Sequence, residues 1–254
     1  MSKDQQYFLQ SLDNALSVVD IICDHGSLTL TEIRKLTGFS NATILRMLST
    51  LEQHKCIQKD QNSKYRLGYK FAYWGNHVEQ HNILISTASP YLLDLRDQYF
   101  ETVHLNTLLP DGKVLFAYRV PGKGSIVMNT VVGSQLEAYC TGTGKMLLAC
   151  LDDENFLKFA DSYHYCKFTD TTITDKKALI NEINAIRSRG YAIDNEESEV
   201  GLYCIAVPIK PDGGQALAAI SISGPTVRMV ANQERIIASL QEVSSCIIKD
   251  LGLN

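Results

Sequence analysis

Residues 28–51 read LTLTEIRKLTGFSNATILRMLSTL, and this stretch decides the amino-terminal fold. It predicts two helices separated by a short turn at Thr37-Gly38, because glycine commonly ends a helix. The first helix is expected over residues 32–36, capped by Thr29 or Thr31. The second is expected to begin after Ser40, a good N-cap, and to end near residue 54. Its apolar residues recur at helical spacing and are expected to be buried: Ile44, Met47, Leu48 and Leu51.

The flanking residues extend these two helices into a winged helix-turn-helix. Upstream, apolar residues at helical spacing predict a helix that ends near His25-Gly26: Leu12, Ala15, Leu16, Val19 and Ile22. Downstream, residues 56–59 and 64–67 are expected to form a hairpin, joined by the polar turn 60–63. Two helices with a short glycine-containing turn, followed by a basic hairpin, are typical of this DNA-binding motif, whose second helix enters the major groove.

The distribution of charge indicates double-stranded DNA as the partner of this segment. The chain of 254 residues carries a formal net charge of −4. Residues 34–70, however, carry eight Lys or Arg against two Asp or Glu, a net charge of +6 in 37 residues. A solvated lysine-rich surface is the alternative for such a run. Arg46 is suited to a guanine edge and Asn41 to adenine. The residues expected to contact DNA are Thr31, Ser40, Asn41, Thr43, Arg46, Lys64 and Arg66.

Composition is that of an ordinary globular chain. Hydrophobic residues make up 45% and charged residues 20%. The longest apolar runs are far short of the ~20 residues that span a bilayer. The first residues lack the pattern of a signal peptide, and the seven cysteines contain no CxxC pair, which disfavours a disulfide framework or zinc ribbon. These features predict a soluble protein of a reducing cytoplasm, with no membrane partner and no cofactor.

Beyond the hairpin the sequence predicts a helical linker and then a mixed domain. Helices are expected over residues 70–82 and 84–99, the second with Pro90 in its first turn or at a kink. Strands are expected at 102–109, 113–120, 126–132, 204–209 and 216–223, with turns at 110–112 and 211–214. Further helices are expected at 144–151, 153–160, 175–189 and 232–251. Strands first and last with helices between them predict an α+β fold on a mostly antiparallel sheet.

Three segments, in order, resemble the IclR family of bacterial transcription regulators. The first is 28–51, with the family's Thr-x-x-Arg-x-Leu core, although Leu45 stands where the family often has arginine or histidine. The second, GSQLEAYCTGTGKMLLACL at 133–151, is similar to the stretch that leads into a GKALLA-type helix. The third, RGYAIDNEESEVGLYCIAVPIKPDGGQALAAISISGP at 189–225, carries GYA-x-D-x-E-E, G-x-x-C-I-A-x-P and S-x-S-G-P elements.

The resemblance implies a winged helix-turn-helix domain at 1–69, a helical linker at 70–83 and a GAF-like effector-binding and oligomerisation domain at 84–254. It implies a homodimer or homotetramer on a pseudo-palindromic operator, more often a repressor, controlled by a small organic or aromatic acid. Carried over residue by residue, the effector site comprises Met128, Gly142, Thr143, Asp194, Leu202, Cys204, Ser221 and Ser223.

The residue types fit an anion site. Residues 142–144 precede a predicted helix, so their backbone N–H groups are exposed toward a ligand. Ser221 and Ser223 alternate along a strand, so both hydroxyls share one face. Without the resemblance, Cys204 is expected to be a small buried hydrophobe and Asp194 a turn residue.

The spacing of residues disfavours an enzyme or metal site. TGTGK at 141–145 departs twice from a phosphate-binding loop, because Tyr139 and Met146 replace the required glycine and hydroxyl residue. His77 and His81 lie four residues apart but lack the glutamate of HExxH. We expect no catalytic residue and no metal. The alternative function is a small-molecule sensor or enzyme whose amino-terminal helical domain only dimerises; indifference to all DNA would favour it.

Overall fold

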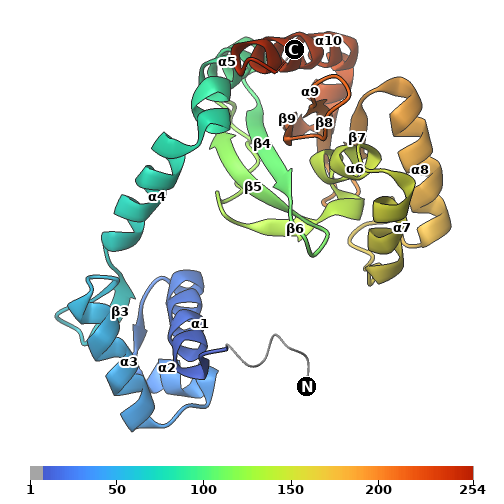
Figure 1. Ribbon diagram of the computed structural model, residues 1–254. Helices are drawn as coiled ribbons and strands as arrows, with labels where there is room; N and C mark the ends of the chain where they lie inside the picture. Colours follow the sequence, from blue (N-terminus) through green and yellow to red (C-terminus); the bar gives the residue numbers. More distant parts are fainter. Residues whose placement is uncertain (1–7, 254) are drawn as a thin grey trace. The chain divides into compact units, whose positions relative to one another are not determined.

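A computed structural model describes residues 8–253, apart from the side chains of residues 79–81. The chain divides into two compact units, residues 1–81 and 82–254. Figure 1 shows the helices and strands of each unit. The residues expected to form a linker, 70–81, are grouped with the first unit, and the three-part division of the chain remains a prediction.

The amino-terminal unit is a helix-turn-helix with a small antiparallel sheet (Figure 1). Its helices are α1 (Gln10–His25), α2 (Leu30–Thr37), α3 (Asn41–Gln53) and α4 (Lys70–His81). Its strands are β1 (Leu28–Thr29), β2 (Ile57–Lys59) and β3 (Lys64–Leu67), in the order β1-β3-β2. The predicted helices and hairpin are confirmed. The two-residue strand β1 was missed, because two residues are too few to show an alternating pattern.

Side-chain caps fix the short turn that presents α3. Thr29, and not Thr31, caps α2: its hydroxyl accepts the N–H of Glu32, whose carboxylate accepts the N–H of Thr29 at 2.7 Å. Gly38 ends α2 at a φ of 72°, a left-handed conformation that glycine adopts without strain. Ser40 then caps α3, as predicted.

An apolar core joins the three helices to the sheet. Its buried members are Val18, Ile22, Leu28, Ile33, Ile44, Met47, Leu48, Ile57 and Tyr65. Two of the apolar residues whose spacing predicted α1, Leu12 and Leu16, are 55% and 52% exposed. The buried face of α1 lies instead along Val18, Val19 and Ile22, so the two leucines form part of an apolar surface.

The carboxy-terminal unit is a six-stranded antiparallel sheet with helices on both faces (Figure 1). The strands are β4 (Thr102–Leu108), β5 (Lys113–Val120), β6 (Gln135–Glu137), β7 (Ala192–Asn195), β8 (Leu202–Ile209) and β9 (Ala218–Pro225), in the order β6-β5-β4-β9-β8-β7. The helices are α5 (Ile83–Tyr99), α6 (Gly142–Ala149), α7 (Asp153–Ser162), α8 (Lys176–Arg189), α9 (Thr226–Ala231) and α10 (Gln233–Asp250), with a 3-10 turn at Ala138–Cys140. The predicted α+β class and antiparallel sheet are confirmed.

The sheet has one apolar face and one polar face. The apolar face packs against α5 and α10 through the alternating residues Val103, Leu105, Ile205, Val207, Ile220 and Ile222. The residues between them face the opposite side, where α6 contacts β4, β8 and β9. Cross-strand pairing aligns Asp194 with Cys204 and Cys204 with Ser223. Polar side chains from three strands therefore meet beneath α6.

The segment 126–132 is not a strand, contrary to the prediction. Within the described residues it joins no ladder, and side chains of Thr102, Arg119 and Arg228 donate to three of its carbonyl groups instead. The edge strand is β6, which pairs with β5. The β-branched residues of the segment favour a strand, but the segment forms no ladder with β5 or any other described strand.

Pro90 lies in the interior of α5, so of the two places predicted for it, the first turn or a kink, the first turn is wrong. Proline has no N–H to donate to the carbonyl of Ser86. The hydroxyl of Ser89 donates to that carbonyl at 3.4 Å instead, which compensates in part for the lost backbone bond.

Candidate DNA-binding surface and effector pocket

Helix α3 exposes the side chains that were predicted to contact base edges. Asn41 and Arg46 are exposed, whereas Ile44, Met47 and Leu48 are buried. Among the described residues, no ion pair or hydrogen bond engages the guanidinium of Arg46. Its fork of N–H donors is therefore free to bind a base edge.

Two other predicted DNA-binding residues take part in capping. The Ser40 and Thr43 hydroxyl oxygens lie 2.9 Å apart, and Ser40 also accepts the N–H of Thr43. Thr31 is exposed in the first turn of α2. All three lie at helix N-termini, where backbone N–H groups favour phosphate. Their contact with DNA remains a prediction.

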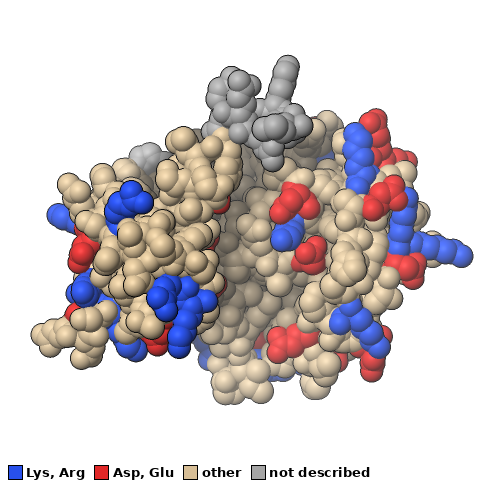
Figure 2. Space-filling view, turned by 90° about the horizontal axis from the view of Figure 1, so that it is seen from below, with Lys and Arg blue, Asp and Glu red and all other residues tan. Residues whose placement is uncertain are grey.

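The hairpin presents the two predicted basic residues on one strand. Lys64 and Arg66 flank the buried Tyr65 on β3, so they share the outward face. The carboxylate of Asp60 accepts the backbone N–H groups of Asn62 and Lys64, which fixes the turn. Figure 2 shows Lys and Arg side chains on this face of the amino-terminal unit with a few Asp and Glu among them, and both signs of charge side by side on the carboxy-terminal unit.

Seven of the eight predicted effector residues line one small cavity in the carboxy-terminal unit. Its volume is about 20 Å³, and the seven are Met128, Gly142, Thr143, Asp194, Cys204, Ser221 and Ser223. Leu202 does not reach this cavity, because it lies at the start of β8, paired with Pro225. It lines an adjoining recess of about 310 Å³ instead. Met128, Leu136 and Ser198 line both spaces and so form the partition between them.

The N-terminus of α6 forms one wall of this cavity. The hydroxyl of Thr141 accepts the N–H of Gly144, and no hydrogen bond among the described residues uses the N–H groups of Gly142 or Thr143. A Cβ atom at Gly144 would lie 2.4 Å from the carbonyl oxygen of Ala138, so only glycine fits there. The N–H groups of Gly142 and Thr143 are therefore available to bind an anion.

Sequence reasoning missed six further residues that line the cavity: His104, Asn106, Phe116, Leu136, Thr141 and Ser198. Two of them have a buried polar atom without a partner among the described residues, Nδ1 of His104 and Oδ1 of Asn106. Nε2 of His104 lies 2.6 Å from the hydroxyl of Thr130, and Asn106 donates to the hydroxyl of Thr143 at 2.8 Å. An unpaired buried polar atom is destabilising by about 1–3 kcal/mol, so these atoms indicate a place for a polar ligand.

Asp194 organises the turn beside the cavity. Its carboxylate accepts the N–H of Glu197 at 2.8 Å and the hydroxyl of Ser198 at 2.7 Å. Burial raises the pKa of Asp194, while the Ser198 hydroxyl and the Lys145 ammonium oppose that rise. Lys145 is itself buried and pairs with Glu197. Asp194 therefore shapes the cavity as well as lining it.

The buried imidazole of His104 predicts acid-sensitive stability. Burial, with a smaller effect from Arg119, lowers the pKa of His104 from 6.5 to about 3. The native state then binds fewer protons than the unfolded state between these values, so stability is lost as the pH falls below 6.5. We expect this residue to contribute a slope of about 1.4 kcal/mol per pH unit in that window.

Urea denaturation of the full chain between pH 7 and pH 5 measures this slope, with His104→Gln as the test variant. The exposed His164→Gln serves as the matched control. A His104→Gln protein that keeps the same dependence of unfolding free energy on pH would show that His104 is not the group responsible.

The described residues contain no group of three or more His, Cys, Asp or Glu side chains that would hold a metal ion. The side chain of His81, part of the histidine pair considered above, lies outside the described residues. No described helix is both long and apolar enough to cross a membrane.

Comparisons with known proteins cover both units. Residues 11–61 match the model of the IclR helix-turn-helix domain, and residues 76–248 match that of the bacterial transcriptional regulator IclR C-terminal domain. The chain is 32% identical over 248 residues to the HTH-type transcriptional regulator XynR of Escherichia coli, covering 96% of this chain and 98% of the relative.

Solved structures show the same architecture. The IclR of Thermotoga maritima superposes with a TM-score of 0.81 at 29% identity, covering 96% of this chain and 100% of that one. An IclR homologue from Microbacterium hydrocarbonoxydans, solved in complex with 4-hydroxybenzoate, superposes with a TM-score of 0.82 at 23% identity, covering 96% and 100%. The latter likeness concerns the fold alone.

Proposed function

The chain belongs to the IclR family of bacterial transcriptional regulators. We propose that it is a repressor whose affinity for its operator is controlled by a small organic acid. It is a DNA-binding regulator modulated by a ligand. One observation carries the proposal: a polar cavity with unpaired donors and acceptors occurs in the same chain as a basic winged helix-turn-helix. Repression follows if the bound protein covers promoter DNA that the polymerase needs.

The amino-terminal unit supports a homodimer on a pseudo-palindromic site. Leu12 and Leu16 on α1 and Trp74 on α4 leave apolar surface uncovered in the single unit. Leu12 and Trp74 are 55% and 46% exposed. A second copy of the chain would bury this apolar surface and place two recognition helices on one operator. A tetramer built through the carboxy-terminal units is the alternative assembly.

The cavity favours a compact hydroxylated carboxylate as effector. The backbone donors of Gly142 and Thr143 suit a carboxylate, and the hydroxyls of Ser221 and Ser223 suit a second polar group. At about 20 Å³ the cavity holds little more than one water molecule, so any larger acid must displace its wall. The partition residue Met128 belongs to the segment without a strand ladder, which is the wall best able to move.

Ligand binding regulates DNA binding only if the acid has different affinities for two arrangements of the chain. We propose that these arrangements differ at the helices between the units and thereby change the spacing of the two recognition helices. An acid that opens the wall at Met128 would favour one of them.

Asp194→Ala is expected to abolish the response to the effector while operator binding persists. The test is a thermal-shift screen of the full chain against aliphatic hydroxy acids and aromatic acids, in which a ligand at about 100 times its dissociation constant adds about 2.7 kcal/mol of stability. Ser221→Ala is the milder variant, because it removes one hydroxyl and leaves the turn at Asp194 intact. If operator affinity collapses in Asp194→Ala and the acid response survives, the assignment of the pocket is wrong.

Leu45 is expected to recognise a thymine methyl group. It lies on α3 beside Arg46 and is 48% exposed, an unusual apolar side chain on a surface that faces DNA. Replacing the contacted thymine with deoxyuridine removes one methyl group, for a loss of about 0.8 kcal/mol or fourfold in affinity.

Fluorescence anisotropy with operators that carry one deoxyuridine at a time locates that thymine. The Leu45→Ala protein should then bind the thymine and the deoxyuridine operators with equal affinity. The matched control is Leu36→Ala, since Leu36 is 49% exposed but lies on α2. Full sensitivity to deoxyuridine in Leu45→Ala would refute the contact.

A further inference from the structure

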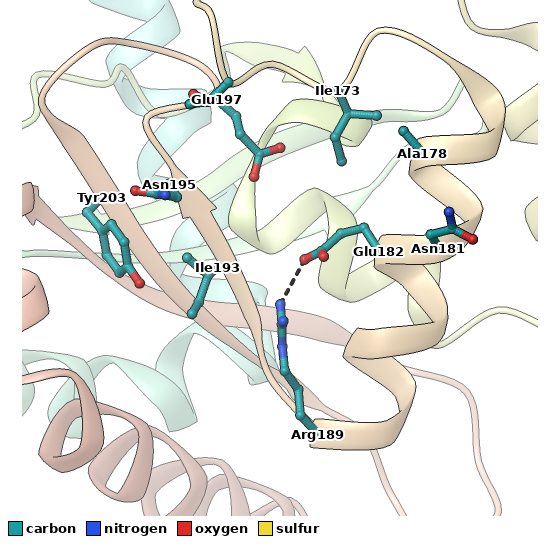
Figure 3. A pocket seen from close by; sticks show the side chains of 10 residues that line it. Ile173, Ala178, Asn181, Glu182, Arg189, Ile193, Asn195, Glu197 and Tyr203 are labelled. Atoms are coloured by element: carbon teal, nitrogen blue, oxygen red, sulfur yellow. Dashed lines mark hydrogen bonds and ion pairs between the residues drawn. The ribbon is translucent and has the colours of Figure 1, made fainter.

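A second recess lies beside the effector cavity and shares strand β7 with it. Asp194 lines the cavity, whereas its neighbours Ile193 and Asn195 point to the opposite side of the strand and line the recess. The recess has a volume of about 610 Å³, within the range of small-molecule sites. Figure 3 shows it between β7 and α8, with the ion pair of Arg189 and Glu182 across its lower part.

The carboxylate of Glu197 indicates that this recess takes a hydrogen-bond donor. The side chain of Glu197 is 9% exposed, and Lys145 binds its Oε1 atom. Its Oε2 atom is buried without a partner among the described residues. Figure 3 shows this carboxylate directed into the space between β7 and α8. A buried carboxylate oxygen without a donor is costly, and a ligand hydroxyl or N–H group would satisfy it.

The charged side chains at the recess form two ion pairs, so their charges cancel. Lys145 pairs with Glu197, and Arg189 donates to Glu182 at 2.8 Å. Lys145 also lies 3.7 Å from Glu182. Because two cations already neutralise two carboxylates, a ligand with a net charge would bring an uncompensated charge into a partly desolvated site. A neutral ligand avoids this penalty.

The remaining lining offers neutral polar groups and apolar contact. The amides of Asn181 and Asn195 have no partner among the described residues, so each supplies donors and an acceptor. Ile173, Ile193 and Tyr203 supply apolar surface. Acceptors, amide groups and apolar walls in a charge-balanced recess match a molecule with several hydroxyl groups on a carbon skeleton.

We propose that this recess binds a small neutral polyhydroxylated ligand, a sugar or a polyol, separately from the acid in the effector cavity. One hydroxyl donates to Oε2 of Glu197, and others exchange hydrogen bonds with Asn181 and Asn195. Because the carboxylate of Asp194 accepts the N–H of Glu197, the two ligands act on one turn. Occupancy of the recess therefore changes the affinity of the effector cavity.

Calorimetric titration of the full chain with matched probes tests the chemistry. Neutral pentoses, hexoses and their alditols are compared with gluconate and glucosamine, which add a negative or a positive charge to the same skeleton. At least one neutral probe should bind about tenfold or more tightly than either charged analogue. Absence of binding by every neutral probe, or equal or tighter binding of a charged analogue, overturns the proposal.

Variants locate the binding. Ala178→Phe adds a large side chain to the lining of the recess, and Asn195→Ala removes one amide; each should weaken binding of the neutral probe about tenfold or more. Ser221→Ala alters the effector cavity alone and should leave this binding in place. Hydrogen exchange should show protection of residues 192–199 on binding. Retained affinity in Ala178→Phe, or loss in Ser221→Ala alone, would assign the binding elsewhere. None of these measurements depends on operator binding, so they stand apart from the repressor proposal.

Discussion

Replacing Arg46 with alanine is expected to weaken operator binding by about 1–3 kcal/mol per half-site, which is about 5- to 150-fold, and to relax base preference at one position. Arg46 is exposed on α3 and its guanidinium has no partner among the described residues. Its bidentate geometry matches the two acceptors of a guanine edge. Competition binding with operators carrying all four base pairs at each position measures both effects.

Lys64→Ala is the matched control for Arg46, because Lys64 lies on the hairpin and is expected to contact phosphate. It should weaken binding to all sequences alike and reduce the salt dependence by about one unit of slope, with base preference unchanged. An Arg46→Ala protein that keeps its full base preference would contradict direct recognition by Arg46.

Lys145→Met is expected to cause the largest loss of stability. The side chain of Lys145 is 1% exposed, and it neutralises Glu197, which is 9% exposed. Burial already raises the pKa of Glu197, and the lysine opposes that rise. Without the ammonium, the buried carboxylate loses its counter-charge, and breaking such a pair is destabilising by about 3–5 kcal/mol. For a chain of this size that is a fall in Tm on the order of 10 °C.

Differential scanning fluorimetry of Lys145→Met measures this fall. Lys158→Met is the control, since the pair of Lys158 with Glu154 is 65% and 80% exposed and should contribute little. Adding Glu197→Leu to Lys145→Met should recover part of the lost stability, because it removes the unpaired carboxylate. A Tm equal to that of the unsubstituted chain would show that Lys145 is not needed to neutralise Glu197.

The amino-terminal fold was predictable because its signals are local. Ser40 as a cap, Gly38 as a stop and the apolar spacing of α3 lie within a few residues of each other. Burial on α1 was less predictable: Leu12 and Leu16 follow the helical spacing, yet the single unit leaves them exposed. Apolar residues at helical spacing indicate that one face of the helix is apolar. The spacing does not show whether that face packs in the core of the unit or against a second copy of the chain.

The carboxy-terminal sheet was predictable only where its strands are long. The strands β6, β7 and the helix α9 are short, and their pairing depends on residues far away in the sequence. The segment 126–132 shows the opposite error, because its β-branched residues favour a strand and yet it forms no ladder. Strand propensity reflects how well a side chain fits a pleated sheet, but a strand forms only where its backbone also pairs with another strand.

The effector residues came from a family resemblance, and the structure brings seven of them together. His104 and Asn106 were missed, although a signal was present: they alternate with Val103 and Leu105 on a predicted strand. Polar residues at alternate positions of a buried strand indicate a polar cavity on that face. The recess at Glu197 had no such signal, because its lining comes from separate segments of the chain.

The most direct test of the central claim is an anisotropy titration of the full chain against DNA from upstream of its own gene, with and without the acid found by thermal shift. The account predicts binding that is specific for sequence, that weakens linearly in log affinity with log salt concentration, and that changes when the acid is added. Equal affinity for unrelated DNA, or an operator affinity that the bound acid leaves unchanged, would contradict a ligand-controlled regulator.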